Sequence, residues 1–557
     1  MAATPERTPD VSGGPRLPGV VFLALSVAIA VAIAAVAIST TQTEPPTVAE
    51  FAPKAVERIE DAPDEQSTRF GADTVAVPGG QRTTANPTVA DDVPPINVPR
   101  ALHCVGAPPR QIEDPQSPPC VPYWEGDNGG ATAQGVTASE ITVAWPLSIE
   151  QIPDIRTLEA FFNSRFQLYG RKIRLRPYSP TGGTFGPADP PAMNSDAAGV
   201  DAELEAFASL MYVPRDGAER QYYDELARRE IVSVDARQSL RDSAHLARWS
   251  PYEWATEPGI DVTSRTTAEW ICKTLKGSPA IHAGPDVPKD GPRTFAVLSA
   301  RAEDGSKPDP ELLSNGIAGC GGTVVSERTL NADNDDLAEG QNVVLDLKLD
   351  EVTSVLCLCT AEQLKSKLMP AATAQGYSPE WLLQPFQFQD RETAATEWPQ
   401  DQAARAFGVS FRNKWLAPED MPWFWAMKEI DPSWEPDPAQ QGYNQAVVER
   451  YSELLILASG IQLAGPTLNA ATLHTGLQRA EFPNPGCGRE PYFQACVSFG
   501  GDHTFHDDGM MTWWSPTQRN YTANQRQGAF CYVGSGVRYE LGAWPTGSQP
   551  FFEGPCR

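Results

Sequence analysis

The chain has 557 residues, 41% of them hydrophobic and 9% aromatic, which is enough to fill the cores of two or three globular domains. The formal net charge is −27, and no basic run appears. These features argue against nucleic-acid binding, because a phosphate-binding surface needs clustered Lys and Arg.

An uninterrupted apolar run covers residues 17–40 and contains no charged residue. A helix of about 20 apolar residues spans a hydrocarbon core of about 30 Å. Arg7 and Arg16 precede the run, whereas the first basic residue after it is Lys54. The positive-inside rule therefore predicts a cytoplasmic tail over residues 1–16, a transmembrane helix over 17–40, and an extracellular remainder at the cell membrane.

A cleaved signal peptide is the alternative for this run, with Ala35, Val36 and Ala37 as the cleavage site. Signal peptides have a shorter apolar core of about 7–15 residues, so length favours a permanent signal-anchor. A lipoprotein anchor is excluded because the first cysteine is Cys104.

Ten cysteines outside the membrane indicate disulfides, because that compartment is oxidising. Three pairs are close enough in sequence to close local loops: Cys104/Cys120, Cys487/Cys496 and Cys531/Cys556. The other four, which allow three pairings, are Cys272, Cys320, Cys357 and Cys359. A zinc site at Cys357 and Cys359 is a weaker alternative, since no second cysteine pair matches them.

Residues 41–125 are rich in Pro, Thr, Ala and acidic residues, with little periodicity. Such a composition predicts an extended stalk that holds a domain away from the membrane. A Cys104–Cys120 loop is expected to order the end of this stalk.

From about residue 136, short apolar strands alternate with amphipathic helices, which predicts parallel sheets covered on both faces. Strands are expected at 141–147, 173–176, 231–234, 294–298, 323–325 and 352–358. Helices are expected at 157–169, 202–210, 222–229, 266–275, 311–316, 361–375 and 445–462. The Trp- and Gly-rich sequence after Trp513 predicts a terminal antiparallel hairpin.

Five segments in order resemble motifs of the leucine/isoleucine/valine-binding type I periplasmic binding proteins. They are GVTASEITV at 135–143, FFN at 161–163 with GRKIRL at 170–175, AQGYSPEW at 374–381, the 451–465 helix, and GGDHTF at 500–505 with Gly509. Because the five matches are collinear over about residues 135–545, the chain is similar to this family over most of its length.

The resemblance implies an α/β fold with two lobes, joined by crossovers and closing on a ligand in the cleft between them. The bilobed domain would cover 126–557, with lobe 1 at about 135–284 and 440–515 and lobe 2 at about 293–415 and 530–557. Crossovers are expected near 284–293, 417–442 and 515–530.

The resemblance also implies ligand-binding positions at the carboxyl ends of strands. The turn after the first strand contains Trp145, Leu147 and Ser148; core packing is the alternative for Trp145. The loop equivalent to the family's carboxylate-binding loop contains Asp235, Ala236, Arg237, Gln238 and Ser239. Arg237 is suited to bind a ligand carboxylate through two hydrogen bonds, although a surface ion pair would explain an arginine at this position equally well. The second lobe would contribute Thr360 and Gln387.

Catalytic motifs are absent: the sequence contains no G-x-S-x-G, H-E-x-x-H or P-loop pattern. His503 and His506 lie among acidic residues, but residues three apart in a strand face opposite sides. We therefore expect no metal ligand in this cluster. Because no catalytic motif is present, we also expect that the protein is not an enzyme and needs no cofactor.

The prediction is an extracellular, membrane-anchored solute-binding protein that serves an ABC permease. Its small-molecule ligand would be a polar or amphipathic metabolite, amino-acid-like in character. The alternative is a sensor or scaffold with the same fold that feeds no transporter.

Overall fold

The computed structural model describes residues 104–105, 110–146, 155–182, 189–212, 219–236, 240–301, 307–436, 443–482, 494–521, 526–554 and 556. The predicted tail, the predicted membrane span at 17–40 and most of the predicted stalk lie outside these residues. Within them, no helix combines the length and hydropathy needed to cross a bilayer.

The first sheet has five parallel strands in the order β4-β3-β5-β6-β7. The strands are β3 (Glu140–Pro146), β4 (Lys172–Tyr178), β5 (Ala208–Ser209), β6 (Val232–Asp235) and β7 (Glu253–Ala255). Parallel strands need covered faces, and the strands consist largely of buried residues. The predicted parallel arrangement is confirmed for this sheet.

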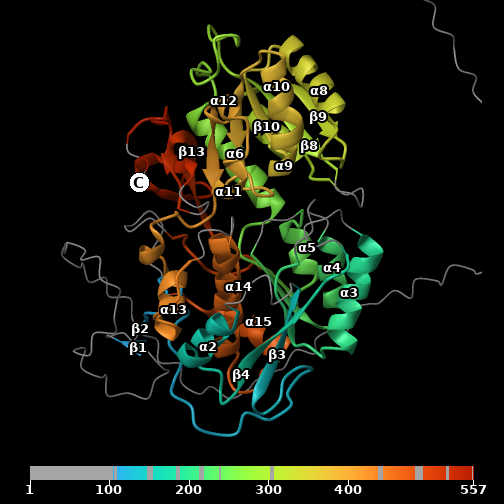
Figure 1. Cartoon of the computed structure of the whole chain (residues 1–557), viewed down its shortest axis with the longest axis vertical. Coiled ribbons are helices and arrows are strands. Elements are labelled where there is room, and N and C mark those ends of the chain that lie inside the picture. The colour runs from blue at the N-terminus through green and yellow to red at the C-terminus, as the bar shows by residue number, and fades with distance from the viewer. Residues whose placement is uncertain are drawn as a thin grey trace, which may run out of the picture. The chain divides into compact units, whose positions relative to one another are not determined.

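Helices cover both faces of the first sheet (Figure 1). Helices α3 (Pro190–Ala202) and α4 (Arg220–Arg228) pack on one face. The other face carries α2 (Ile155–Arg165), α13 (Pro422–Ile430), α14 (Tyr443–Ala464) and α15 (Ala470–Arg479). The short helix α5 (Ser243–Arg248) lies between β6 and β7 in sequence. This sheet and these helices form the first lobe.

The second sheet has the order β14-β13-β12-β11-β10-β8-β9, with β15 paired to β13. Its parallel strands are β8 (Thr294–Ala300), β9 (Thr323–Leu330), β10 (Ser354–Leu358), β11 (Glu380–Leu383) and β12 (Ala406–Ser410). The antiparallel strands are β13 (Asp508–Arg519), β14 (Gln527–Tyr532) and β15 (Arg538–Glu540). The expected terminal hairpin is therefore confirmed.

Side chains alternate across the second sheet, as a period of two requires. In β8, Phe295 and Val297 enter one core, while Ala296 and Leu298 enter the other. Helices α6 (Ile260–Thr274) and α7 (Glu311–Gly319) cover the first of these cores. The second is covered by α8 (Leu337–Leu349), α9 (Ala361–Gln363), a π-turn (Leu364–Leu368), α10 (Met369–Ala374), α11 (Glu392–Ala395) and α12 (Gln400–Ala403). This sheet and these helices form the second lobe.

One predicted helix is wrong. The stretch 202–210 was expected to be helical, but the structure ends α3 at Ala202 and forms strand β5 at Ala208–Ser209. Ala208 pairs with Val143 of β3 and with Val232 of β6. A two-residue strand between two neighbours is buried on both faces, so its sequence shows no period that separates it from a helix.

The chain passes between the lobes earlier than expected at all three crossovers. Helix α6 belongs to the second lobe because Trp270 and Ile271 pack with Phe295, so the first crossover follows β7 rather than lying near 284–293. Helix α13 already packs in the first lobe, which places the second crossover directly after β12. Strand β13 begins at Asp508, ahead of the expected third crossover at 515–530.

The end of the predicted stalk belongs to the folded domain. Strands β1 (Cys104–Val105) and β2 (Arg110–Gln111) pair, and the expected Cys104–Cys120 disulfide closes this segment. Gln111 accepts a hydrogen bond from Gln462 of α14 at 2.9 Å. The folded domain therefore begins before residue 126, because residues between 110 and 120 are buried by packing against α14.

The structure also settles most of the disulfide pattern. Cys531 bonds to Cys556 as expected, and the four cysteines left open pair as Cys272–Cys320 and Cys357–Cys359. Cys496 is disulfide-bonded, while Cys487 lies outside the described residues.

Candidate ligand-binding site

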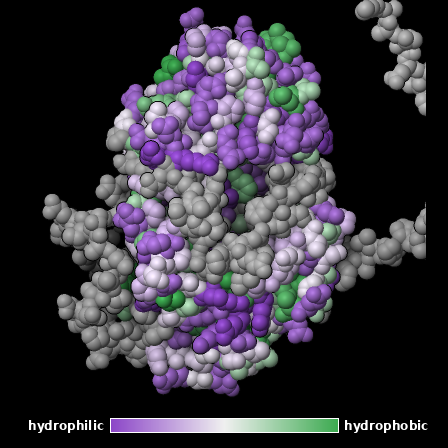
Figure 2. Space-filling view, viewed as in Figure 1, coloured by the Kyte–Doolittle hydropathy of each residue, from purple (hydrophilic) through white to green (hydrophobic). Residues whose placement is uncertain are grey.

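A pocket with polar and aromatic walls lies where the chain crosses between the lobes. All three crossovers line it, through Thr256 and Glu257, through Arg412, Asn413 and Trp415, and through Gln494 and His506. Helices α13 and α14 contribute Trp423, Glu449 and Tyr451. A space-filling view shows a hollow near the middle of one largely hydrophilic face (Figure 2).

The pocket is narrow in this structure, with a volume of about 50 Å³. An apolar cavity of about 150 Å³ holds one benzene molecule, so this pocket has room for a few waters. Binding of a metabolite here requires the walls to move apart, which hinged lobes allow.

The N-terminal segment forms one wall of the pocket. Tyr451 of α14 donates a hydrogen bond from its hydroxyl to Oδ2 of Asp114 at 2.9 Å. Gln116 donates from Nε2 to Oδ1 of Asn413 at 3.3 Å and to the carbonyl of Ala495 at 3.1 Å. The Cys104–Cys120 segment is thus attached both to the first lobe and to the second crossover.

The guanidinium of Arg412 contacts carboxylates from both lobes. Its Nε lies 2.9 Å from Oδ1 of Asp390, which follows β11 in the second lobe. Its Nη2 lies 3.1 Å from Oε1 of Glu257, which follows β7 of the first lobe. Glu449 of α14 lies 3.9 Å away and also contacts Arg391 of the second lobe. These contacts connect the two lobes directly beside the pocket.

Burial controls the protonation of this cluster. Loss of solvent raises the pKa of Glu257 to about 8, although Arg412 acts in the opposite direction. Burial, together with the charges of Arg538 and Arg412, lowers the pKa of the His506 imidazole to about 3. At neutral pH the pocket therefore presents a neutral imidazole and a carboxyl that is largely protonated.

A second buried cluster lies at the carboxyl ends of β3 and β5. The guanidinium of Arg450 lies 5.1 Å from the centre of the Trp145 ring and donates to the carbonyl of Met211 at 3.1 Å. It also pairs with Glu453 at 2.7 Å. Burial raises the pKa of Glu453 to about 7. Trp145 is 1% exposed, so in this structure its ring is part of the core.

The predicted ligand-binding residues that the structure describes lie in different places. Ala236 lines the pocket, but the Asp235 carboxylate pairs with Arg241 at 2.5 Å. The Thr360 hydroxyl caps helix α9 by accepting from Gln363 N at 3.1 Å, and the Gln387 carbonyl accepts from Ala361 N at 2.9 Å. Leu147, Ser148, Arg237, Gln238 and Ser239 lie outside the described residues, so ligand contact by these ten positions stays a prediction.

The predicted histidine cluster divides between two places. His503 stacks on Trp254 with ring centres 4.5 Å apart, and its Nδ1 lies 2.7 Å from the carbonyl of Glu253. His506 lines the pocket instead.

Sequence reasoning missed Glu257 and Arg412, the two central residues of the pocket. Glu257 follows β7 by two residues and Arg412 follows β12 by two residues. Ligands of open α/β sheets bind beyond the carboxyl ends of strands, so polar residues at these positions were a usable signal. It was overlooked because β7 has only three residues and was not predicted.

No family model matches the sequence, and no curated protein matches it. Solved structures do match. The substrate-binding protein of an ABC transporter from Aeropyrum pernix is 11% identical, with a TM-score of 0.50, and the match covers 72% of this chain and 96% of that one. The chain has the fold of ABC transporter substrate-binding proteins. The resemblance to type I periplasmic binding proteins is thus confirmed at the level of fold.

Two further similar structures have lower TM-scores. A solute-binding protein from Rhodopseudomonas palustris BisB5, in complex with 3,4-dihydroxybenzoic acid, is 10% identical with a TM-score of 0.48, and the match covers 72% of this chain and 97% of that one. A fatty acid ABC transporter substrate-binding protein from Thermomonospora curvata is 13% identical with a TM-score of 0.46, and the match covers 73% of this chain and 94% of that one.

Proposed function

We propose that this chain is an extracellular solute-binding protein, anchored by residues 17–40, that captures a small polar or amphipathic metabolite for an ABC importer. The observation that supports it best is the pocket bordered by all three crossovers, with Arg412, Glu257, Tyr451 and Trp415 in its walls. A fold shared with a substrate-binding protein agrees with this proposal.

The pocket suits a ligand with both polar and flat apolar parts. Arg412 offers charged donors, Glu257 and Glu449 offer acceptors, and Trp415 and Tyr451 offer aromatic faces. Because Arg412 bridges both lobes, a ligand that contacts it in the widened pocket would favour one lobe arrangement over others, as closure on a solute requires. An amino-acid-like metabolite fits this set of groups.

Ligand capture is tested by the thermal stability of the full-length chain in detergent across a metabolite library. A ligand that binds only the folded form raises the melting temperature with its concentration. We expect at least one small metabolite to do so in the wild type and in Arg328→Ala, an exposed control. Arg412→Ala should abolish the shift. The absence of a hit in the library, together with no bound solute in native mass spectrometry, would sink the proposal.

Anchoring is tested separately by cell fractionation. The intact chain should sediment with membranes and keep its N-terminal peptide in mass spectrometry. A chain that lacks residues 17–40, directed outside by a cleavable signal, should appear in the soluble fraction. Recovery of the wild-type chain without its first 37 residues would instead identify a cleaved signal peptide.

A further inference from the structure

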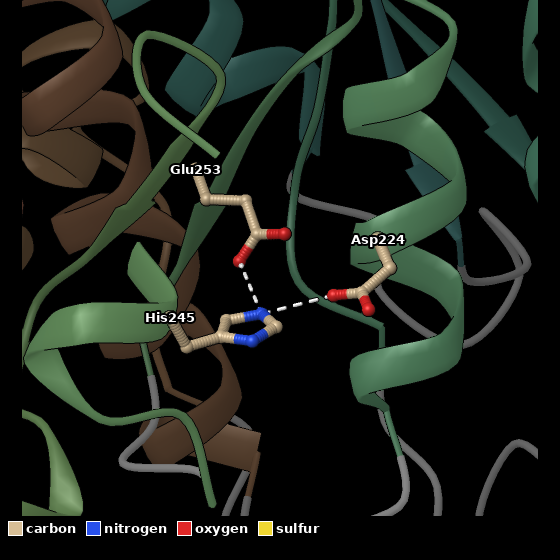
Figure 3. Close-up of side chains that lie close together, drawn as sticks. All are labelled: Asp224, His245 and Glu253. Atoms are coloured by element: carbon tan, nitrogen blue, oxygen red, sulfur yellow. Dashed lines mark ion pairs between the residues drawn. The ribbon is translucent and has the colours of Figure 1, made fainter. Parts of the chain in front are cut away.

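Three metal-ligating side chains meet inside the first lobe, away from the pocket. Asp224 comes from α4, His245 from α5 and Glu253 from β7 (Figure 3). The Nε2 atom of His245 lies 2.9 Å from Oδ1 of Asp224 and 3.4 Å from Oε2 of Glu253. One potential ligand atom from each residue lies within 4.8 Å of the other two.

All three side chains are buried, and their polar atoms are poorly satisfied. His245 is 8% exposed and Glu253 is 0% exposed. Nε2 of His245, Oδ1 of Asp224 and Oε1 of Glu253 have no hydrogen-bond partner of good geometry within the described part of the chain. An unsatisfied buried polar atom costs about 1–3 kcal/mol, so three together call for an explanation.

A hydrogen on the imidazole satisfies this arrangement only in part. A ring nitrogen carries at most one hydrogen, so Nε2 of His245 can serve both carboxylates only by sharing that hydrogen between them, which weakens each bond. Figure 3 shows Nε2 facing both carboxylates at once. A cation placed between Nε2 of His245, Oδ1 of Asp224 and Oε2 of Glu253 would contact these three atoms together.

The spacing of the three atoms fits coordination by zinc. Zinc binds histidine nitrogen and carboxylate oxygen at about 2.0–2.2 Å, so ligand atoms in a tetrahedral site lie about 3.3 Å apart. The distances of 2.9 and 3.4 Å from Nε2 to the two oxygens are close to this value. Only small shifts would therefore be needed to admit an ion.

The local charges also favour a divalent cation. Asp235 and Glu253 share one buried guanidinium, that of Arg241, while Asp224 contacts His245. Arg241 lies 2.5 Å from Asp235 and 3.2 Å from Oε2 of Glu253, so it neutralises only part of this charge. Arg220 lies 3.7 Å from Asp224, but its side chain is 39% exposed and screened by water. The three carboxylates of Asp224, Asp235 and Glu253 thus outnumber the one buried guanidinium by two.

We propose that Asp224, His245 and Glu253 bind a divalent metal ion of the zinc type, with water in the remaining coordination position. The mixed nitrogen and oxygen ligands favour a transition-metal ion over Ca²⁺ or Mg²⁺, which prefer oxygen alone. Arg241 then acts on the ligand Glu253 from outside the coordination sphere and orients its carboxylate.

The proposed role of this ion is structural. It would join α4, α5 and β7 through one side chain from each. Through Arg241 it would also hold Asp235, the last residue of β6, directly before Ala236 at the pocket. The inference concerns the stability of the first lobe and does not depend on which solute the protein binds.

The test uses the full-length chain in detergent, purified without a polyhistidine tag and stripped with a chelator. Elemental analysis after dialysis against Zn²⁺ should find about one zinc per chain in the wild type. Zinc should also raise the melting temperature, by roughly 5 °C at a hundredfold excess over Kd. Thiolates offer no competing site, since no cysteine in the described residues is free.

Variants show whether zinc occupies this site. His245→Gln and Glu253→Gln should lose both the zinc and the rise in melting temperature. His474→Gln is the matched control, because it removes a half-buried imidazole of the same lobe that lies beside His503. That variant should bind zinc like the wild type.

Asp224→Asn covers the case in which the two buried variants fail to fold, since the Asp224 side chain is 12% exposed at the rim of the cluster. Co²⁺ in place of zinc supplies a spectroscopic readout, and Asp224→Asn should alter the visible spectrum of the Co²⁺ protein. A wild type without stoichiometric zinc, or a folded Asp224→Asn with unchanged zinc affinity and Co²⁺ spectrum, overturns the inference.

Discussion

The guanidinium of Arg412, two residues beyond β12, lies 3.1 Å from the carboxylate of Glu257, two residues beyond β7. This contact joins the first and second crossovers at the edge of the pocket. Asp390 of the second lobe and Glu449 of the first also contact Arg412. The relative position of the lobes is therefore coupled to the charges beside the candidate ligand site.

Arg412→Ala should lower the free energy of unfolding by about 3–5 kcal/mol, because removing one partner of a buried ion pair leaves the other charges uncompensated. Chemical denaturation of the purified chain measures this loss. Arg328→Ala is the control, since Arg328 is 40% exposed in its pairs with Asp346 and Asp350. Arg328→Ala should lower the free energy of unfolding by about 0–1 kcal/mol. An equal loss in both variants would contradict the proposed contribution of the Arg412 contacts to stability.

Raising the pH from 7 to 9.5 should destabilise the protein through Glu257. Its pKa in the folded chain is raised to about 8 by burial, so its contribution to stability is complete below its unfolded pKa and is lost as the pH rises through 8. The loss from this group between pH 7 and 9.5 is about 1 kcal/mol. Melting temperatures across this range measure it.

Folding at pH 7 requires Glu257 to take up a proton, because its pKa is ordinary in the unfolded chain and raised in the folded one. Glu257→Gln imitates the protonated carboxyl without this uptake, so it should raise stability at pH 7 and should fall less than the wild type between pH 7 and 9.5. The exposed Glu203→Gln should keep the wild-type pH dependence. A Glu257→Gln profile parallel to that of the wild type would show that other carboxyls cause the loss; Asp507 and Glu113, whose pKa values burial raises to about 8, are the first to test.

Replacing both Cys104 and Cys120 by Ser should release the N-terminal wall of the pocket. The disulfide closes a loop over 16 residues and should contribute about 3 kcal/mol to stability. Amide hydrogen exchange should rise in residues 110–120, which contain Asp114 and Gln116. The same replacement at Cys272 and Cys320 is the control: it should lower stability by about as much without changing exchange at 110–120.

Tyr451→Phe should lower the free energy of unfolding by about 1–3 kcal/mol, because it removes a donor to the buried Asp114 carboxylate. Tyr123→Phe removes the hydroxyl that donates to Glu125 at 2.8 Å, but Tyr123 is 50% exposed. Water replaces that bond, so the control should change stability by less than about 0.5 kcal/mol. Urea denaturation of both variants compares them, and equal losses would argue against the Asp114 contact.

Local sequence patterns predicted the elements well where periodicity was strong. The apolar alternation around Val143 predicted β3, and the long, mostly apolar stretch between Leu454 and Ile461 predicted α14. The two-residue strand β5 was missed, because Ala208 and Ser209 depend on neighbours distant in sequence for their pairing. Hydrogen bonds between parallel strands leave no local signal.

The sequence did not predict to which lobe each helix belongs. Trp270 makes α6 amphipathic, but amphipathicity does not say which sheet receives the apolar face. The crossovers were misplaced for this reason. The candidate pocket was missed for a related reason. Glu257 and Arg412 are separated by more than 150 residues and follow strands of different sheets, so they meet only once both lobes are folded.

The sequence alone determined the acidic character, the alternating α/β pattern, the local disulfides at Cys104 and Cys531, and an apolar run long enough to cross a membrane. Each of these follows from composition or from short-range spacing along one chain. Tertiary structure decided which helices cover which sheet, how the four remaining cysteines pair, and which charges meet in the pocket and around His245. These depend on burial and electrostatic pairing between distant segments, whose energies exist only once the chain is folded.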